Sequence, residues 1–196
     1  QLMSNIEQAQ IVVIGGGAVG CSVAYHLAKA GLTDVLVVEK EPSVAAATTA
    51  QAAGLVGQVR STVERVKLAM WSVQTFCKLQ EDADANPSWR QVGSLRVALT
   101  DERCEEFRRM KAVADQAGLD VDFIDHKSAA DKWPGMNFDR AKAILWCPTD
   151  GYLQPYDLTQ AYCAQSRRLG VRFLTNTAVM EIPTKEGCVI GVMTNG

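Results

Sequence analysis

The stretch IVVIGGGAVGCSVAYHLAKAGLTDVLVVEK, residues 11–40, decides the fold of this chain. It opens on four apolar residues, as buried strands of parallel sheets do, and after a glycine-rich turn its apolar residues recur at helical spacing up to residue 28. Gly31 then stands where a glycine ends a helix, and residues 35–38 form a second apolar run. The stretch therefore predicts a strand, a helix and a second, parallel strand.

The turn inside this unit carries three glycines at the spacing GxGxxG: Gly15, Gly17 and Gly20. The first makes a tight turn, the second lets a pyrophosphate approach the backbone, and the third lets the helix pack against the strand. The helix start then offers N–H groups and a positive dipole end to phosphates. Glu39 follows the second strand, where a carboxylate can accept hydrogen bonds from an adenosine ribose. Together these features predict a site for an adenine dinucleotide. The acid argues against a 2′-phosphate on it, while the neighbouring Lys40 leaves that alternative open.

Length and composition are those of a globular domain. The chain has 196 residues, 47% of them apolar and 21% charged, with a formal charge of -2. Its apolar runs are shorter than a membrane span needs, and its basic residues alternate with acidic ones, so we expect no membrane span and no nucleic acid partner. Six scattered cysteines without a CxxC pair predict buried free thiols in a reducing compartment. No metal-ligand spacing occurs, so no metal is expected.

Beyond residue 40 the pattern changes to an irregular loop of small residues and then to alternating helices and strands. We predict helices over residues 62–83, from Thr100 to Gly118 and from about residue 154 to Leu169, strands at residues 95–99, 121–123 and 143–146, and a hairpin turn at residues 185–187. A domain that binds NAD would usually continue from Glu39 into further strand–helix units, whereas a region inserted here suits a flavin enzyme. FAD is therefore favoured, and NAD remains the alternative.

Five segments together resemble one family in order and spacing. They are the glycine loop, VVEK at residues 37–40, TTAQAAGL at 48–55, GSLRVA at 93–98 and DGYLQPYDL at 150–158. They resemble the N-terminal half of the FAD-dependent amine and amino-acid oxidoreductases of the D-amino-acid oxidase (DAO) superfamily, nearest the dimethylglycine and sarcosine dehydrogenase or oxidase branch. The resemblance covers nearly the whole chain from residue 11 onward.

This resemblance implies an α/β fold over residues 1–196, an incomplete FAD-binding domain of the DAO type. Residues 11–60 and 148–196 would form a Rossmann-like FAD-binding part with a strand-rich C-terminal tail, and residues 61–147 an inserted helical, substrate-side part. A further half of the domain, or a partner subunit, would complete it.

The resemblance also implies which residues contact an extended FAD. The glycine loop would hold the pyrophosphate, with a pair of threonine hydroxyls nearby, the acid after the second strand would hold the ribose, and the AAGL backbone would approach the flavin. The residues so implied are Gly15, Gly16, Gly17, Ala18, Val19, Gly20, Glu39, Lys40, Thr48, Thr49, Gln51, Ala53, Gly54, Leu55 and Val179.

The implied activity is oxidation of the C–N bond of an N-methylated amino acid or related amine by hydride transfer to FAD, in a bacterial cytoplasm or a mitochondrial matrix. In the dimethylglycine and sarcosine dehydrogenases the position of Gln51 is commonly a histidine bonded covalently to the flavin. Glutamine cannot form that bond, so we expect non-covalent FAD. The catalytic residues stay unknown, and a non-catalytic FAD-binding subunit or regulatory relative is the alternative.

Several conspicuous side chains have ordinary structural interpretations. We expect His26 to be structural and His126 to be solvated in a charged turn. Asp150 could be a base, but a role in shaping a turn through an Asx-type hydrogen bond is favoured. The planar fork of Arg60 could meet a carboxylate substrate, although a surface ion pair is favoured. Trp71 is assigned to the core.

Overall fold

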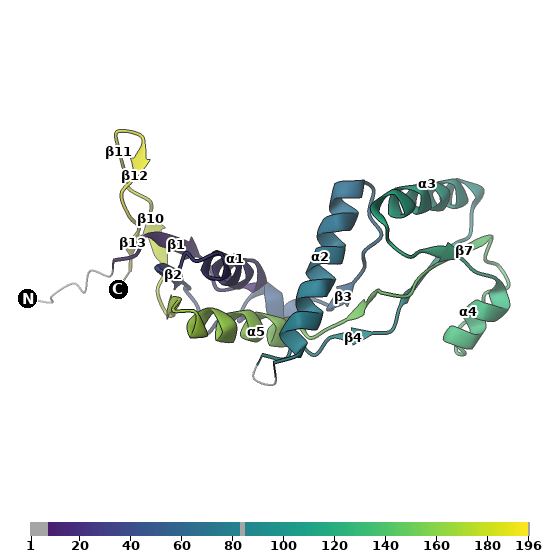
Figure 1. Cartoon of the computed structure of the whole chain (residues 1–196), viewed down its shortest axis with the longest axis horizontal. Coiled ribbons are helices and arrows are strands. Elements are labelled where there is room, and N and C mark those ends of the chain that lie inside the picture. Colours follow the sequence, from purple (N-terminus) through teal and green to yellow (C-terminus); the bar gives the residue numbers. More distant parts are fainter. Residues whose placement is uncertain (1–7, 83–84, 196) are drawn as a thin grey trace, which may run out of the picture. The chain divides into compact units, whose positions relative to one another are not determined.

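The computed structural model describes residues 8–82 and 85–195, except for the side chains of residues 48 and 50. It divides into two compact units, one formed by residues 1–54, 79–88 and 154–196 and the other by residues 55–78 and 89–153. Figure 1 labels the elements along the chain. Each unit is described by itself below.

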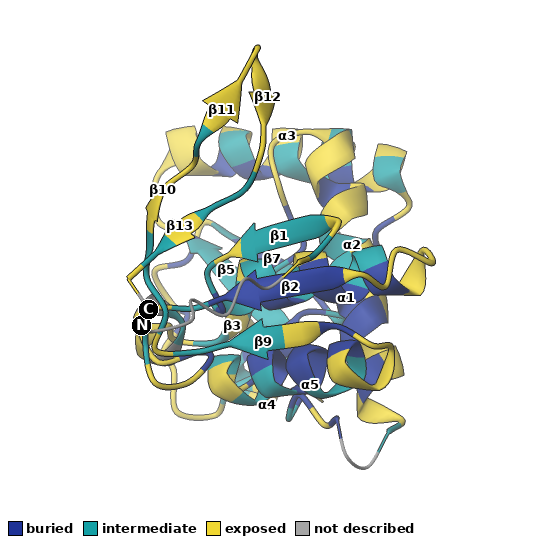
Figure 2. Ribbon diagram, turned by 90° about the vertical axis from the view of Figure 1, so that its left-hand side faces the viewer, coloured by how far each residue is buried: buried dark blue, intermediate teal, exposed yellow. Residues whose placement is uncertain are grey.

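The first unit is built on a parallel sheet with the strand order β1-β2-β9. Strand β1 (Ile11–Ile14) pairs with β2 (Val35–Val38), and β2 pairs with β9 (Arg172–Leu174). All four residues of β2 are buried, and Figure 2 shows this strand in dark blue between its two neighbours. The predicted strand, helix and parallel strand are therefore confirmed.

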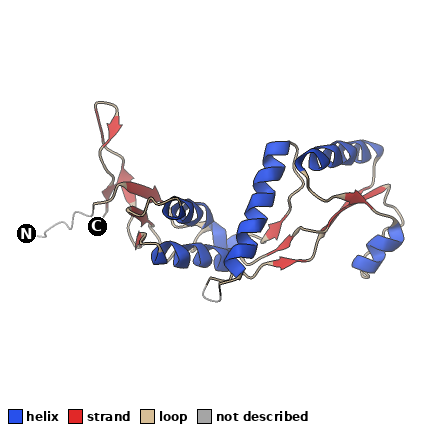
Figure 3. Cartoon of the chain, viewed as in Figure 1, coloured by secondary structure: helices blue, strands red, loops and turns tan. Residues whose placement is uncertain are grey.

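Two helices of the first unit pack against each other, α1 (Ala18–Lys29) and α5 (Pro155–Arg168). Both appear as blue coils beside the red strands in Figure 3. Ala24 and Ala28 of α1 form a core cluster with Val35, Val37 and Val171. Helix α1 ends as predicted, since the Gly31 N–H donates to Ala28 O at 2.9 Å and the Leu32 N–H donates to Leu27 O at 3.0 Å, the pattern of a Schellman motif.

The rest of the first unit consists of short elements. They are the 3-10 helix η1 (Thr48–Gln51) and the strands β10 (Val179–Glu181), β11 (Thr184–Lys185), β12 (Cys188–Val189) and β13 (Met193–Thr194). Strands β11 and β12 pair across Glu186 and Gly187, which both have positive φ, so the predicted hairpin turn is confirmed as a two-residue type I′ loop.

The second unit contains two antiparallel sheets with the orders β3-β8-β4 and β5-β7-β6. The strands are β3 (Leu55–Val56), β4 (Arg90–Gln91), β5 (Ser94–Ala98), β6 (Asp122–Phe123), β7 (Ala143–Cys147) and β8 (Gly151–Tyr152). Helix α3 (Asp101–Ala117) begins and ends as predicted, because the Thr100 hydroxyl accepts from the Arg103 N–H at 3.3 Å and Gly118 is the C-cap. Helix α2 (Val63–Gln80) contributes Val66 to a buried hydrophobic cluster, which also contains Phe107 of α3 and Leu145 of β7.

The structure corrects several sequence predictions, three of which concern the following side chains. His126 is exposed, as expected, but it lies at the start of helix α4 (His126–Lys132) and not in a turn, and its Nε2 is 2.9 Å from Ala141 O. A helix of seven residues is too short to give a clear apolar period. Cys77 and Cys188 are exposed, so the expectation of buried thiols holds only for the other four cysteines. Trp71 is 49% exposed and is not a core residue.

Across residues 8–82 and 85–195, no helix has the length and apolar character that crossing a membrane would require. In the same residues, no group of three or more histidine, cysteine, aspartate or glutamate side chains is placed to hold a metal ion.

Candidate functional site

The glycine loop lies at the end of β1 and leads directly into α1. The Gly15 N–H donates to Val38 O at 2.8 Å, which ties the loop to the end of β2. A methyl group at Gly20 would overlap the carbonyl oxygen of Gly15, so only glycine allows α1 to pass this close to the turn. The third glycine of GxGxxG thus has the packing role that the motif predicts.

Glu39 reaches back to this loop. Its Oε2 accepts from the Gly16 N–H at 2.5 Å, and its Oε1 accepts from the Glu41 N–H at 2.8 Å. Each carboxylate oxygen has two lone pairs, so both retain the capacity to accept a second hydrogen bond. The Lys40 side chain is 69% exposed, and its Nζ lies 3.8 Å from Glu41 Oε1.

The start of α1 is open at its N-terminal end. Its N-cap, Gly17, has no side-chain cap, and the Thr49 hydroxyl accepts from the Ala18 N–H at 3.2 Å. The first N–H groups of a helix have no partner within the helix, so this end attracts anions. Val19, in the same turn, is 79% exposed although it is apolar. The structure thus brings the Thr49 hydroxyl to the start of α1, beside the glycine loop.

The remaining predicted cofactor residues are placed as follows. Gln51 and Ala53 are exposed, Gly54 has φ +72°, and the side chain of Thr48 lies outside the described part of the structure. The segment leading to Val179 lies beside Glu39, since the Thr177 N–H donates to Glu39 O at 2.9 Å. Leu55 belongs to the second unit, where its side chain is 82% exposed.

Cys21 lies directly beneath the glycine loop. Its thiol donates to Gly16 O at 3.4 Å and is fully buried. Burial, and then the neighbouring Cys163, raise the pKa of Cys21 to about 12. The thiol is therefore neutral and a poor nucleophile at physiological pH.

His26 follows on the same helix among aromatic rings. Its ring centre is 4.8 Å from that of Tyr25 and 6.1 Å from that of Tyr162. Burial, and then the charge of Lys29, lower its pKa, which favours the neutral imidazole. This setting agrees with a structural role.

The second unit contains a cavity of about 610 Å³ that the sequence did not predict. Most of its wall is apolar, with a few charged and polar groups. Its lining comes from residues 55–57, Arg60, residues 92–97, Trp133, Met136 and residues 150–152. Two of the motifs that carry the family resemblance, GSLRVA at residues 93–98 and DGYLQP at residues 150–155, therefore both contribute to the lining of this cavity. Their presence in one chain was the sequence signal that could have indicated the cavity.

Asp150 forms the buried polar centre of this wall. The side chain is fully buried, Oδ1 accepts from the Gln58 N–H at 2.8 Å and from Gln58 Nε2 at 3.1 Å, and Oδ2 accepts from the Ser94 hydroxyl at 2.6 Å. Its main-chain carbonyl accepts from the Gly93 N–H at 2.8 Å. The predicted local Asx-type turn is wrong, because the carboxylate bonds to residues far away in the sequence.

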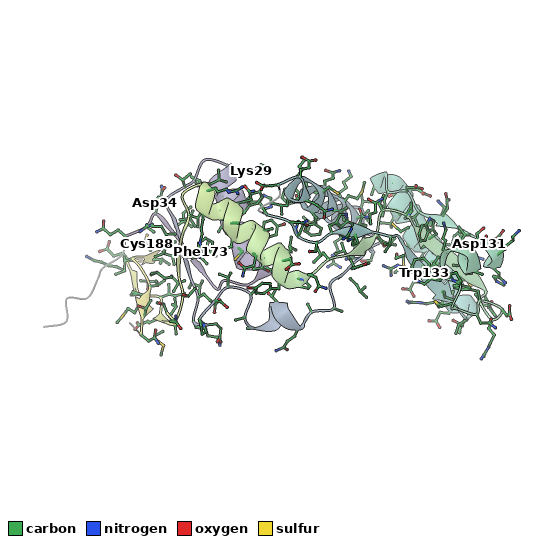
Figure 4. All side chains as sticks on the ribbon, turned by 90° about the horizontal axis from the view of Figure 1, so that it is seen from below. Lys29, Asp34, Asp131, Trp133, Phe173 and Cys188 are labelled. Atoms are coloured by element: carbon green, nitrogen blue, oxygen red, sulfur yellow. The ribbon has the colours of Figure 1, made fainter. Side chains whose placement is uncertain are left out.

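Gly93 and Trp146 are fitted tightly together at this cavity. A methyl group at Gly93, which has φ +76°, would overlap the indole ring of Trp146. That indole packs edge-on against Trp133 with ring centres 5.9 Å apart, and Lys132 Nζ lies 4.2 Å from its centre. Trp133, labelled in Figure 4, belongs to the cavity lining. Gly93 therefore determines where this aromatic wall can lie.

Comparison with known proteins assigns the family. The DAO family, described as FAD dependent oxidoreductase, matches residues 10–196. The chain belongs to this family. It is 33% identical over 184 residues to 4-methylaminobutanoate oxidase (formaldehyde-forming) of Paenarthrobacter nicotinovorans, an alignment covering 94% of this chain and 22% of that protein. It is 35% identical over 165 residues to the mitochondrial dimethylglycine dehydrogenase of Rattus norvegicus, covering 84% of this chain and 19% of that enzyme.

A solved structure agrees with this assignment. The L-proline dehydrogenase from P. horikoshii superimposes with a TM-score of 0.90 at 29% identity, over 96% of this chain and 50% of that one. The predicted fold class and the resemblance to the dimethylglycine branch of the DAO family are thereby confirmed. The chain spans about a fifth of the length of the two sequence relatives.

Proposed function

We propose that this chain is the FAD-binding part of an oxidoreductase that oxidises the C–N bond of an N-methylated amino acid or a related amine. The observation that carries the proposal is the grouping of the glycine loop, Glu39 and Thr49 at the open N-terminus of α1. Membership of the DAO family supports it. The N-methyl substrate is supported by the names of the two sequence relatives, 4-methylaminobutanoate oxidase and dimethylglycine dehydrogenase.

The residues present fit the adenosine and pyrophosphate parts of FAD. The N–H groups at the start of α1, from Gly17 to Gly20, would hold the pyrophosphate together with the Thr48 and Thr49 hydroxyls. Glu39, oriented by the Gly16 N–H, would accept the ribose hydroxyls. Beside this acid, Lys40 and the main chain of Val179 complete the adenosine side.

The segment after η1 would approach the flavin. Gln51 has no nucleophilic atom that could form a covalent flavin bond, so the cofactor is held non-covalently. Ala53, Gly54 and Leu55 would contact it through their backbone. When bound, FAD accepts the hydride, and the protein supplies binding, orientation and exclusion of water.

The domain assignment remains part of this proposal. Residues 11–60 and 148–196 form the Rossmann-like part, residues 61–147 the inserted substrate-side part, and a further half or a partner subunit completes the enzyme. We place the protein in a reducing compartment, either a bacterial cytoplasm or a mitochondrial matrix; in support, one relative comes from Paenarthrobacter nicotinovorans and the other is named as mitochondrial.

The test is an anaerobic absorbance experiment on the purified protein with any partner chain present. Flavin bands are expected, and dimethylglycine, sarcosine or 4-methylaminobutanoate should bleach them. Acid precipitation should leave the flavin in the supernatant. Flavin bands that none of these amines bleaches would indicate a non-catalytic FAD-binding subunit, and a colourless protein that binds NAD would contradict the proposal altogether.

A further inference from the structure

Both polar groups of the Gly16 main chain are bonded to other parts of the first unit. The N–H donates to Glu39 Oε2 at 2.5 Å, and the carbonyl oxygen accepts from the Ala45 N–H at 3.0 Å and from the Cys21 thiol at 3.4 Å. A methyl group at Gly16 would lie 3.0 Å from Val44 Cγ1 and 3.2 Å from Glu39 Cβ, so side chains close in on this residue as well. The second residue of the glycine loop is therefore held in one orientation.

Ala45 donates its hydrogen bond from an unfavourable backbone conformation. Its φ is +65°, in the left-handed region that residues with a side chain rarely adopt, and the residue is buried. Such a conformation persists only where the surrounding structure determines it, and it is common at ligand-binding sites. The hydrogen bond to Gly16 O is the contact that Ala45 makes with the glycine loop in this conformation.

Cys21 donates to the same oxygen from helix α1. The thiol is fully buried, and burial is the largest cause that raises its pKa to about 12. It therefore keeps the proton that it donates at any physiological pH. A thiol is a weaker donor than a hydroxyl, so a serine here would also be able to hold the oxygen.

The orientation of Gly16 O determines the direction of the next N–H group. Gly16 O and the Gly17 N–H belong to one peptide unit, and in a planar trans peptide the two point in opposite directions. Since Ala45 and Cys21 hold the oxygen, the Gly17 N–H points away from both of them. Among the described residues, none accepts a hydrogen bond from this N–H. A methyl group at Gly17 would lie 3.2 Å from Thr49 Oγ1, so the Thr49 hydroxyl is close by.

We propose that Cys21, together with the Ala45 N–H, is a positioning residue that directs the Gly17 N–H toward the pyrophosphate of the bound dinucleotide. Neither residue has to touch the cofactor. A donor that is already fixed in direction costs no further ordering when the anion binds. The inference deepens the proposed function and rests on it, since the pyrophosphate is that of FAD. It concerns the diphosphate alone, because the adenosine would be held by Glu39.

The test compares ADP with adenosine as ligands of the full chain freed of flavin, by isothermal titration calorimetry. ADP carries the diphosphate, and adenosine has only the part that Glu39 would hold. Cys21→Ala removes the donor, so its affinity for ADP should fall by roughly three- to tenfold while its affinity for adenosine stays the same. A general loosening of the loop would instead weaken the binding of both ligands, because Glu39 is anchored in the same loop.

Two variants accompany Cys21→Ala. Cys21→Ser restores a donor and should recover at least part of the ADP affinity. Cys163→Ala is the matched control, because it removes an equally buried thiol from α5 and leaves the donors to Gly16 O in place. It should change neither affinity. If Cys21→Ala does not fold, Cys21→Val takes its place, since valine fills the space of the thiol without supplying a donor.

Equal ADP affinity in Cys21→Ala and Cys163→Ala would overturn the inference. So would a parallel loss of adenosine affinity, a serine variant that binds ADP as weakly as the alanine variant, or a lack of ADP binding in the unchanged chain. Flavin content and amine-driven bleaching are measured separately. Selective loss of ADP affinity in a protein whose flavin no amine bleaches would uphold the role of Cys21 and refute the proposed amine oxidation. Bleaching by an amine, with equal ADP affinity in the two cysteine-to-alanine variants, would do the opposite.

Discussion

The Gly16 N–H and Glu39 Oε2 are 2.5 Å apart, so the acid after the second strand is anchored in the glycine loop itself. Loop and acid are therefore a single structure, in which the position of the carboxylate depends on the conformation of the turn. This coupling explains why the two belong together in a dinucleotide site.

Replacing Glu39 should weaken FAD binding. In Glu39→Gln an amide NH₂ group replaces one carboxylate oxygen. This NH₂ group faces a backbone N–H and cannot accept the hydrogen bond that the oxygen accepted. We expect FAD affinity to fall by roughly tenfold or more, in line with the loss of a charged hydrogen-bond acceptor. Fluorescence titration of the apoprotein with FAD measures this. Glu41→Gln is the control, and equal affinities for the two variants would contradict the assignment of Glu39 to the ribose.

Adding one methyl group to the third glycine should damage both the loop and the site. In Gly20→Ala the new methyl group overlaps the Gly15 carbonyl, so α1 must move away from the turn. We expect a loss of about 1–3 kcal/mol in the free energy of unfolding together with reduced FAD binding. Chemical denaturation and FAD titration check the two effects. Gly135→Ala is the matched control, because its methyl group would have no neighbour within 4 Å, and it should change neither quantity.

Gly93 should tolerate substitution only if Trp146 is reduced in size. In Gly93→Ala the methyl group overlaps the indole, and the positive φ of +76° adds backbone strain, so we expect destabilisation of about 3 kcal/mol. The double variant Gly93→Ala/Trp146→Leu should recover part of that loss relative to the sum of the single variants. Thermal and urea unfolding of all four proteins measure the coupling, and strictly additive effects would contradict the contact.

Thiol labelling should separate the exposed from the buried cysteines. Cys77 and Cys188 are exposed, and burial raises the pKa of Cys21 to about 12 and that of Cys147 to about 11. At pH 8 iodoacetamide should therefore modify Cys77 and Cys188 quickly and the four buried thiols only after denaturation, as read by mass spectrometry.

The same pKa shifts give a pH dependence of stability. The folded-state pKa values of Cys21 and Cys147 lie above the ordinary value of 9.0, so the folded state binds these protons more tightly. Their contribution to stability is complete below pH 9 and is lost as the pH rises toward 11 and 12. Urea unfolding measures the free energy of unfolding at pH 8 and at pH 10. If neither the unchanged chain nor Cys21→Ala is less stable at pH 10 than at pH 8, the prediction is contradicted.

The sequence predicted the parts of the structure that depend on local signals. The first strand, helix and strand could be predicted because apolar spacing, the glycines and the acid all lie within residues 11–40, and Thr100 and Gly118 were recognisable as helix ends. Helix α4 was missed because seven residues carry too little periodicity.

The cavity could not be predicted in this way. The partners of Asp150 are Gln58, 92 residues away, and Ser94, 56 residues away, so no local pattern contains their contact. Arg60, in the loop after β3, was considered as a carboxylate ligand, but Arg96 of strand β5, which like Arg60 donates to the carbonyl oxygen of Val59, was not recognised. Such constellations follow from sheet pairing, which is determined by tertiary contacts.

The hydrogen bonds of Asp150 have a consequence for how this protein can change. Because one carboxylate joins the segments around residues 58, 94 and 150, substitutions in these three places will not act independently. An engineer who wishes to alter the ligand preference of the cavity should exchange the three segments as one block, since a substitution in one of them leaves a buried donor or acceptor in another without its partner.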